Sequence, residues 1–325
     1  MSTGRKCGHV LLIWSTLLLV AAAPACDKAS RSPSAPTPTP GDTGPPPPPV
    51  PQANRTMAFV STRDGSPFIY VTSPDGSSVT RLASGRNPSW SRDGRRIAFT
   101  GVDGGIYVMN ADGSGQMRLG DGGFPNWSPD GTRIVFNSLC CGVGGIFVMN
   151  ADGSAPTRIV ASDFVQPGDS LQMPIWSPNG RQIAFVRANY DEPWQIYVVN
   201  ADGSSPRRLI NGSIPSQSDP AWSPDGTSII FASFFGIGVL NADGSGWRTL
   251  ASGRLFDPDW TADGRAVVYN RFTSSVGDEV SSLGSRMRIF MTANDGSERQ
   301  VVPDAPTASM PNYWDYQAAC SRSGR

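Results

Sequence analysis

The chain has 325 residues, enough for one large domain with additional segments. Its 27 basic and 27 acidic residues balance. Segment 1–53 holds four of the basic and two of the acidic residues, so the rest of the chain has 23 basic and 25 acidic residues. No surplus of basic residues therefore favours nucleic-acid binding. The one histidine, His9, lies near the N-terminus, which excludes Ser-His-Asp or Cys-His catalysis and histidine-ligated metal in the rest of the chain.

The N-terminal segment has the features of an export signal. Arg5 and Lys6 precede an apolar run over residues 10–20, and small residues fill positions 21–25 before Cys26. We predict a signal peptide over residues 1–25. Small residues directly before a cysteine resemble the bacterial lipobox, which favours diacylglycerol on Cys26. Ordinary cleavage before Cys26 is the alternative, and it would release a soluble secreted protein.

Residues 26–53 form a proline-rich segment with ten prolines, including the run at 45–49. Such a composition cannot bury a core, so we predict a disordered linker with polyproline II character. A spacer of this kind would hold the following domain away from a membrane. The alternative is an unstructured leader without a role.

A motif of the form Trp-Ser-Pro-Asp-Gly recurs through residues 54–316. It begins at five tryptophans, and Trp314 stands in a related context one residue longer; the six are Trp90, Trp127, Trp176, Trp222, Trp260 and Trp314. A proline stands two residues before each of the first five. Repetition at a period of about 40 residues indicates one supersecondary unit stacked several times.

Each repeat is predicted to hold four short strands. In one unit residues 124–127 form an inner strand. Residues 132–136 follow as the second strand, with Ile134 and Phe136 alternating with their neighbours, and the β-branched and aromatic residues of 145–149 form the third. An Asp-Gly turn then leads to an outer strand at 156–160, and Asp-Gly between two strand patterns favours a hairpin. This second turn occurs six times, at Asp75, Asp112, Asp152, Asp202, Asp243 and Asp295.

These counts predict an all-β fold, a six-bladed β-propeller of four-stranded antiparallel blades. The first repeat begins at Met57 without an inner strand, and residues 309–314 form an inner strand without successors. We therefore expect residues 309–314 to complete the N-terminal blade and close the ring, with residues 317–325 as a tail. Closure removes a sheet edge that would otherwise favour aggregation.

The motifs Pro-x-Trp-Ser-Pro-Asp-Gly, Ile-Tyr-Val-Met-Asn and Asp-Gly-Ser followed by Arg-Leu resemble the TolB-type β-propeller repeat, a WD40-like propeller family, over about residues 57–314. The resemblance implies a propeller fold. TolB carries an α/β domain ahead of its propeller, whereas the corresponding residues here have signal and linker character.

Several chemistries lack their residues. No Gly-x-Ser-x-Gly elbow, P-loop or dinucleotide fingerprint is present, and Lys28 is the last lysine. The spacing of the Asp-Gly pairs differs from calcium loops, so we interpret them as turns and expect no cofactor or metal. Cys140 and Cys141 are neighbours that either form a vicinal disulfide or simply occupy a loop.

The channel mouth on the rim with the variable loops is the candidate binding region, because recognition usually lies on variable loops of a rigid frame. Residues flanking the strand prolines reach this mouth. The polar and acidic candidates are Asn87, Asn126, Asp219, Asp257, Asp259 and Asn312. Apolar neighbours are Phe124, Met173 and Met310. Ordinary solvated channel residues are the alternative interpretation.

The sequence thus favours a non-catalytic, monomeric lipoprotein of the bacterial cell envelope, periplasmic or at the surface, whose propeller binds a protein or peptide. The first alternative is a glycan hydrolase or lyase that uses channel carboxylates. The second is a structural spacer without a ligand. The recurring tryptophans are expected to fill the wedges between blades rather than to bind a ligand.

Overall fold

The computed structural model describes residues 57–73, 77–138, 144–160, 169–189, 192–210, 216–274, 285–293, 298–301 and 315–320. Every regular element in these ranges is a β-strand. No helix long and apolar enough to span a membrane occurs among the described residues. The predicted signal peptide, the linker, Cys26, Cys140 and Cys141 lie outside these ranges.

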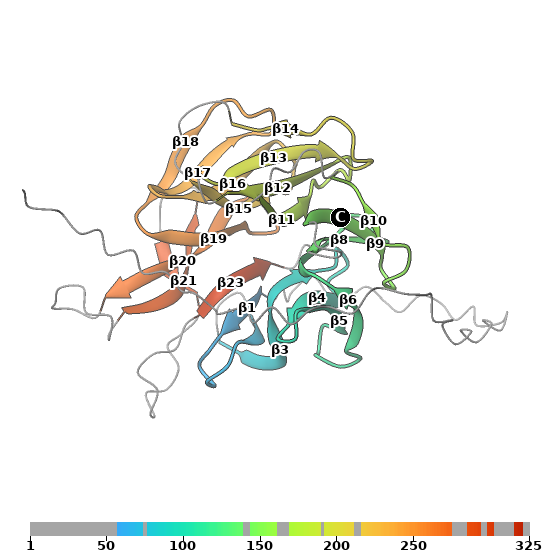
Figure 1. The fold of residues 1–325 in the computed structure, drawn as a ribbon. Helices are drawn as coiled ribbons and strands as arrows, with labels where there is room; N and C mark the ends of the chain where they lie inside the picture. Colours follow the sequence, from blue (N-terminus) through green and yellow to red (C-terminus); the bar gives the residue numbers. More distant parts are fainter. Residues whose placement is uncertain are drawn as a thin grey trace, which may run out of the picture. The chain divides into compact units, whose positions relative to one another are not determined.

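The strands form five hydrogen-bonded sheets arranged around a common centre (Figure 1). The first sheet has seven strands in the order β23-β1-β2-β3-β4-β5-β6. Their bounds are β23 Asp315–Cys320, β1 Met57–Ser61, β2 Phe68–Thr72, β3 Val79–Trp90, β4 Arg96–Gly101, β5 Gly105–Asn110 and β6 Met117–Asp121.

The other four sheets have four antiparallel strands each, in chain order from the centre outward. The second sheet holds β7 Gly123–Trp127, β8 Arg133–Ser138, β9 Gly145–Asn150 and β10 Thr157–Arg158. The third holds β11 Ser170–Trp176, β12 Gln182–Ala188, β13 Gln195–Asn200 and β14 Arg207–Arg208. The fourth holds β15 Gln217–Trp222, β16 Ser228–Ser233, β17 Gly236–Asn241 and β18 Arg248–Ser252. The fifth holds β19 Leu255–Trp260, β20 Ala266–Ser274, β21 Ser285–Ala293 and β22 Glu298–Gln300.

The expected six separate blades are not what the structure shows, because two repeats share one sheet. The 12-residue strand β3 pairs with β2 through Val79–Ser84 and continues into pairing with β4 through Gly85–Trp90. No break separates the outer strand of the first repeat from the inner strand of the second. The motif count could not show that this connection stays extended, so it predicted six separate blades where the structure has five sheets.

The C-terminal strand joins the N-terminal sheet, but at a different place from the one expected. β23 runs antiparallel to β1, with Ser61 opposite Asp315 and Met57 opposite Cys320 (Figure 1). In the next repeat, Trp90 lies opposite Ile97. Ile97 stands two residues before Phe99, and Met57 stands two residues before Phe59, so Ile97 and Met57 hold equivalent positions. Cys320 thus occupies the register of the recurring tryptophan. The prediction that residues 309–314 form this strand is wrong, and Trp314 lies outside the described residues.

The Ser-Pro-Asp-Gly turns close through their own side chains. In the turn after β7, the Ser128 hydroxyl donates to Asp130 Oδ1 at 2.5 Å, and the backbone N–H of Arg133 donates to Ser128 Oγ at 2.9 Å. Gly131 has a φ of 69°, a conformation that favours glycine. These bonds explain why serine, aspartate and glycine recur together.

The core lies between neighbouring sheets. Trp127 is 5% exposed and packs with Ala98, Ile106 and Val108 of the preceding repeat and with Ile134, Phe136 and Met149 of its own. Trp90, Trp176 and Trp222 lie in equivalent clusters, and the half-buried Trp260 packs against another. The guanidinium carbon of Arg96 lies 4.5 Å from the centre of the Trp127 ring. This packing supports a structural role for the described tryptophans.

The second turn also connects neighbouring repeats. A Cβ added to Gly153 would lie 3.0 Å from the carbonyl oxygen of Leu119, and one added to Gly203 would lie 2.4 Å from that of Ile159. Both carbonyl groups belong to the preceding repeat. These glycines therefore allow a close approach between repeats as well as a tight turn.

We predict that Gly244→Ala lowers the free energy of unfolding by about 3 kcal/mol. The first cause is the backbone of Gly244, whose left-handed φ of 95° is unfavourable for alanine. The second cause is overpacking, because the new Cβ would lie 2.1 Å from the Leu209 carbonyl oxygen. Gly131→Ala is the matched control, because its φ is 69° with nothing within 4 Å. It should cost only about 1–2 kcal/mol. Urea denaturation of both variants measures the difference, and equal losses would contradict the inter-repeat contact.

Candidate functional site

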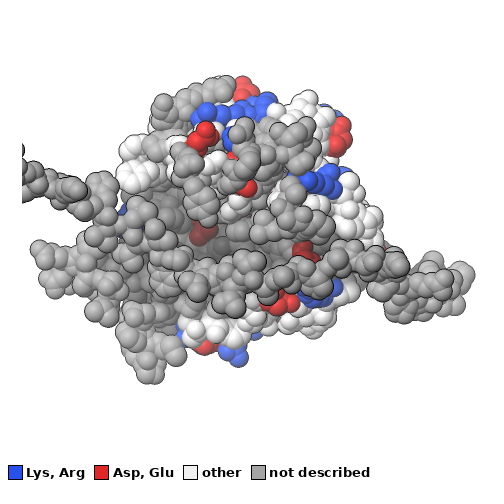
Figure 2. Space-filling view, in the orientation of Figure 1, with Lys and Arg blue, Asp and Glu red and all other residues white. Residues whose placement is uncertain are grey.

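The inner strands surround a central channel of about 770 Å³. Its lining comes from β3, β7, β11, β15 and β19 and from the turns that follow them. Figure 2 shows a hollow near the centre of one face, with acidic side chains in red within it. The five inner strands line the channel in the same way because each carries a proline two residues before its tryptophan.

Each of these inner strands is interrupted by a bulge next to its proline. The residue before the proline has a positive φ between 47° and 53° in all five: Asn87, Phe124, Met173, Asp219 and Asp257. The strand registers shift at the same places. Bulges re-aim side chains, and left-handed backbone at non-glycine residues is strained, so such positions cluster at functional sites. All five residues line the channel.

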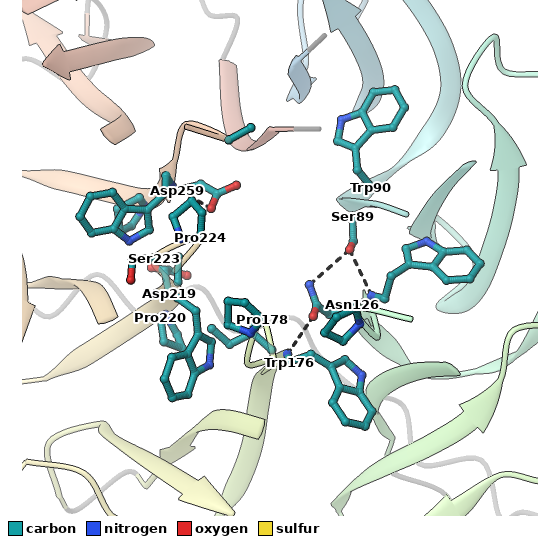
Figure 3. Close-up of a pocket in the computed structure, with 18 of the residues that line it drawn as sticks. Ser89, Trp90, Asn126, Trp176, Pro178, Asp219, Pro220, Ser223, Pro224 and Asp259 are labelled. Carbon is teal, nitrogen blue, oxygen red and sulfur yellow. Dashed lines mark hydrogen bonds between the residues drawn. The ribbon is translucent and has the colours of Figure 1, made fainter. Parts of the chain in front are cut away.

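One side of the channel carries a polar network that joins three strands. The Asn126 side-chain amide donates to Ser89 Oγ at 3.3 Å, and Asn126 Oδ1 accepts from the backbone N–H of Trp176 at 2.9 Å (Figure 3). The labelled rings of Trp90 and Trp176 point away from the channel centre. The hydrogen bonds on this side of the wall hold adjacent strands together.

The opposite side carries what we term the acidic sector, which consists of Asp219, Asp257 and Asp259. Ser218 donates to Asp219 Oδ2 at 2.7 Å, and the backbone and carboxyl group of Asp257 also hydrogen-bond to Asp219. Asn270 donates to Asp257 Oδ2 at 2.9 Å. Figure 3 places Asp219 and Asp259 across the channel from Asn126. Asp219 on β15 and Asp257 on β19 thus meet although they are far apart in sequence.

The surroundings of Asp219 shift its pKa. Burial raises the pKa of Asp219 above its ordinary value, while hydrogen bonds from Ser218 and Asp257 offset part of that shift. Two adjacent carboxylate charges repel each other, and a cation bound beside them would favour the ionised form of both carboxyl groups.

We predict that Asp219→Asn stabilises the propeller by about 1 kcal/mol near pH 7, the usual order for relieving a destabilising functional group. A raised pKa in the folded state means that wild-type stability falls as pH rises from the ordinary carboxyl pKa toward the folded pKa. The neutral variant avoids this loss, so the gain should disappear in acid. Thermal melts across pH measure it.

Asp243→Asn serves as the control for that prediction, because its expected effect on stability at neutral pH has the opposite sign. The Ser245 hydroxyl and backbone N–H hold the pKa of Asp243 below its ordinary value. The ionised Asp243 carboxylate therefore stabilises the fold at neutral pH, and this stabilisation is lost as pH falls through the pKa of Asp243 in the folded state. The control variant should be slightly less stable at neutral pH, and a pH-independent effect of Asp219→Asn would contradict the raised pKa of Asp219.

The structure brings five of the six predicted mouth residues into one channel lining. They are Asn87, Asn126, Asp219, Asp257 and Asp259, and Phe124 and Met173 also line it. Asn312 and Met310 lie outside the described residues. Sequence reasoning missed Ser89, Ser218 and Asn270. The position of Ser89 before Trp90 could have indicated it, whereas nothing in the repeat pattern points to Asn270.

The chemistry available here is that of carboxyl, amide and hydroxyl groups. No group of three or more His, Cys, Asp or Glu side chains that could hold a metal occurs among the described residues. Neighbouring carboxyl groups can donate or accept a proton, and they can bind a cationic group.

Comparison with known proteins shows similarity in structure. No family model matches the chain, and no curated protein matches it by sequence. TolB from Acinetobacter baumannii superposes with a TM-score of 0.66 at 17% identity, covering 83% of this chain and 67% of that one. A chain of a nidogen/laminin complex gives 0.61 at 12% identity, covering 76% and 93%. An oligogalacturonate lyase in complex with manganese gives 0.53 at 15% identity, covering 79% and 76%.

At these identities the comparisons concern the fold. The repeat motifs, the sheets around a central channel and the superposition with TolB agree with one another. The chain therefore has the fold of the TolB-type β-propellers.

Proposed function

We propose that this protein is a non-catalytic propeller of the bacterial cell envelope that binds a segment of another protein in its central channel. The observation that carries the proposal is the channel wall, which carries amide and hydroxyl groups on one side, an acidic sector on the other, and five bulged strands. A concave site with a few fixed polar groups suits a ligand segment. The TolB fold is consistent with a protein-binding role.

A photocrosslinker in the channel tests this function. Phe124 lines the channel, so p-benzoylphenylalanine can replace it with little change of shape. Trp247, 42% exposed and following the turn at Asp243, is the matched control position. We expect a discrete protein adduct in intact cells from position 124 and none from 247. No adduct from position 124, or the same adducts from both positions, would contradict the proposal.

We also propose that six repeats surround the channel, with the seven-stranded sheet acting as two blades. β23, β1, β2 and the first half of β3 form one four-stranded group, and the second half of β3 forms another with β4, β5 and β6. The two groups share only β3. On this interpretation the protein acts as a monomeric ring.

Anchoring through a lipid on Cys26 completes the proposal, supported by the small residues before that cysteine. Two acyl signals suffice for stable membrane attachment. Cys26→Ala is expected to move the protein from the membrane pellet to the soluble fraction. Intact-mass analysis gives an independent check, since an unmodified Cys26 in the mature wild-type protein would exclude the lipid anchor.

A second candidate is a glycan hydrolase or lyase, favoured by the contact between Asp219 and Asp257. Two neighbouring carboxyl groups can serve as general acid and general base. Incubation with polygalacturonate and other acidic glycans, followed by chromatography of the products, tests for turnover. Activity that disappears in Asp219→Asn would favour this candidate over binding alone, and a spacer without a ligand would show neither adduct nor turnover.

A further inference from the structure

The channel differs in charge from the rest of the propeller. Its charged lining residues are Arg92, Asp219, Asp225, Asp257, Asp259 and Asp263. Five of these six are acidic, whereas 23 basic and 25 acidic residues remain after segment 1–53. Asp225 is held in its turn by Ser223 and Thr227. The acidic sector is therefore the part of the wall that is not explained by turn formation.

A buried amide supports the acidic sector from behind. Asn270 has no exposed surface and donates to Asp257 Oδ2 at 2.9 Å, while its own Oδ1 has no hydrogen-bond partner in the described part of the chain. A buried polar atom without a partner costs free energy. The amide group of Asn270, which is not part of the channel lining, thus holds the Asp257 carboxyl group in place from behind the wall.

Three exposed aromatic residues lie near the starts of β15 and β19, the two strands that carry the acidic sector. Phe234 and Phe235 are 79% and 54% exposed at the tip of the β16–β17 hairpin. The Phe235 carbonyl accepts from Gly253 at 3.2 Å, two residues before β19 begins. Trp194, 37% exposed, accepts through its carbonyl from Gln217, the first residue of β15, at 2.8 Å. We call Trp194, Phe234 and Phe235 the aromatic rim.

We infer that the channel recognises a cationic side chain, arginine or lysine, in an extended segment of a partner protein, whose adjacent apolar residues rest on the aromatic rim. The inference rests on the proposed binding function. A guanidinium or ammonium group would form charge-assisted hydrogen bonds with Asp219 and Asp257, which both line the channel. Charge complementarity thus selects the inserted residue, and the exposed aromatic area holds its neighbours.

Selection from a library of random short peptides tests this inference on the folded propeller. We expect peptides enriched on the wild type to contain arginine or lysine next to an apolar residue. Combined Asp219→Asn and Asp257→Asn should abolish that enrichment, and combined Phe234→Ser and Phe235→Ser should remove the apolar preference. Asp202→Asn, at an exposed turn that does not line the channel, is the matched control and should select as the wild type does.

The strongest selected peptide is then resynthesised with citrulline in place of arginine, or norleucine in place of lysine. Its affinity by calorimetry should fall at least about tenfold, the order expected when one partner of a desolvated charge pair is removed. Melting curves confirm that each variant is folded. No enrichment, enrichment without basic residues, or enrichment that survives Asp219→Asn with Asp257→Asn would overturn the inference. A channel adduct from position 124 together with such a result would leave the proposed function standing and this inference refuted.

Discussion

Deleting residues 315–325 is expected to lower the melting temperature by roughly 10 °C or more and to reduce solubility. The deletion removes β23, which aligns four residue pairs with β1. A backbone hydrogen bond contributes about 1 kcal/mol net, and β1 would gain a free edge although all five of its residues are buried. Differential scanning calorimetry and light scattering measure the two effects.

The matched control for this deletion removes only residues 321–325, which follow β23. This shorter deletion should leave melting and solubility unchanged. If the chain that ends at residue 314 melted like the full chain and remained monomeric, the pairing of β23 with β1 would not stabilise the fold.

Trp127→Ala is expected to lower the free energy of unfolding by about 3–5 kcal/mol through the cavity that it leaves. The indole is 5% exposed, lies between residues of two repeats and stacks against Arg96. Neither sheet can close this space alone, because the backbones on both sides are held by their own strand pairs. Urea denaturation of the purified variant measures the loss.

Trp247→Ala controls for the loss of a tryptophan as such, because this ring is 42% exposed. It should change stability by no more than about 0.5 kcal/mol. Peptide binding by the folded fraction of the Trp127 variant should be unchanged. An unchanged melting temperature together with lost binding would make the tryptophans a binding site instead of inter-repeat packing.

Much of the fold follows from local chemistry that the sequence displays. Serine, aspartate and glycine in the repeated turns predict hairpins, since the bonds that close them involve only neighbouring residues. The alternating apolar residues predict the strands for the same reason. The error at the C-terminus arose because Trp314 was matched by residue type, whereas the register is set by pairing with β1, which places Cys320 opposite Met57.

The candidate site was visible from sequence only as a set of positions. The residues beside the strand prolines could be assigned to the channel mouth, because every repeat places them at the same point. Their left-handed backbone, the network from Ser89 to Trp176 and the contact between Asp219 and Asp257 could not be predicted. Each depends on how far one inner strand lies from the next.

The sequence by itself thus determined the repeat, its turns and its strand order, because these depend on residues within one unit of about 40 positions. The tertiary structure decided which strand meets β1, that β3 runs through two repeats, and which carboxyl groups lie together. Those features arise from packing between units. Contacts between units depend on distances across the channel and between sheets, and the local pattern of residues does not contain those distances.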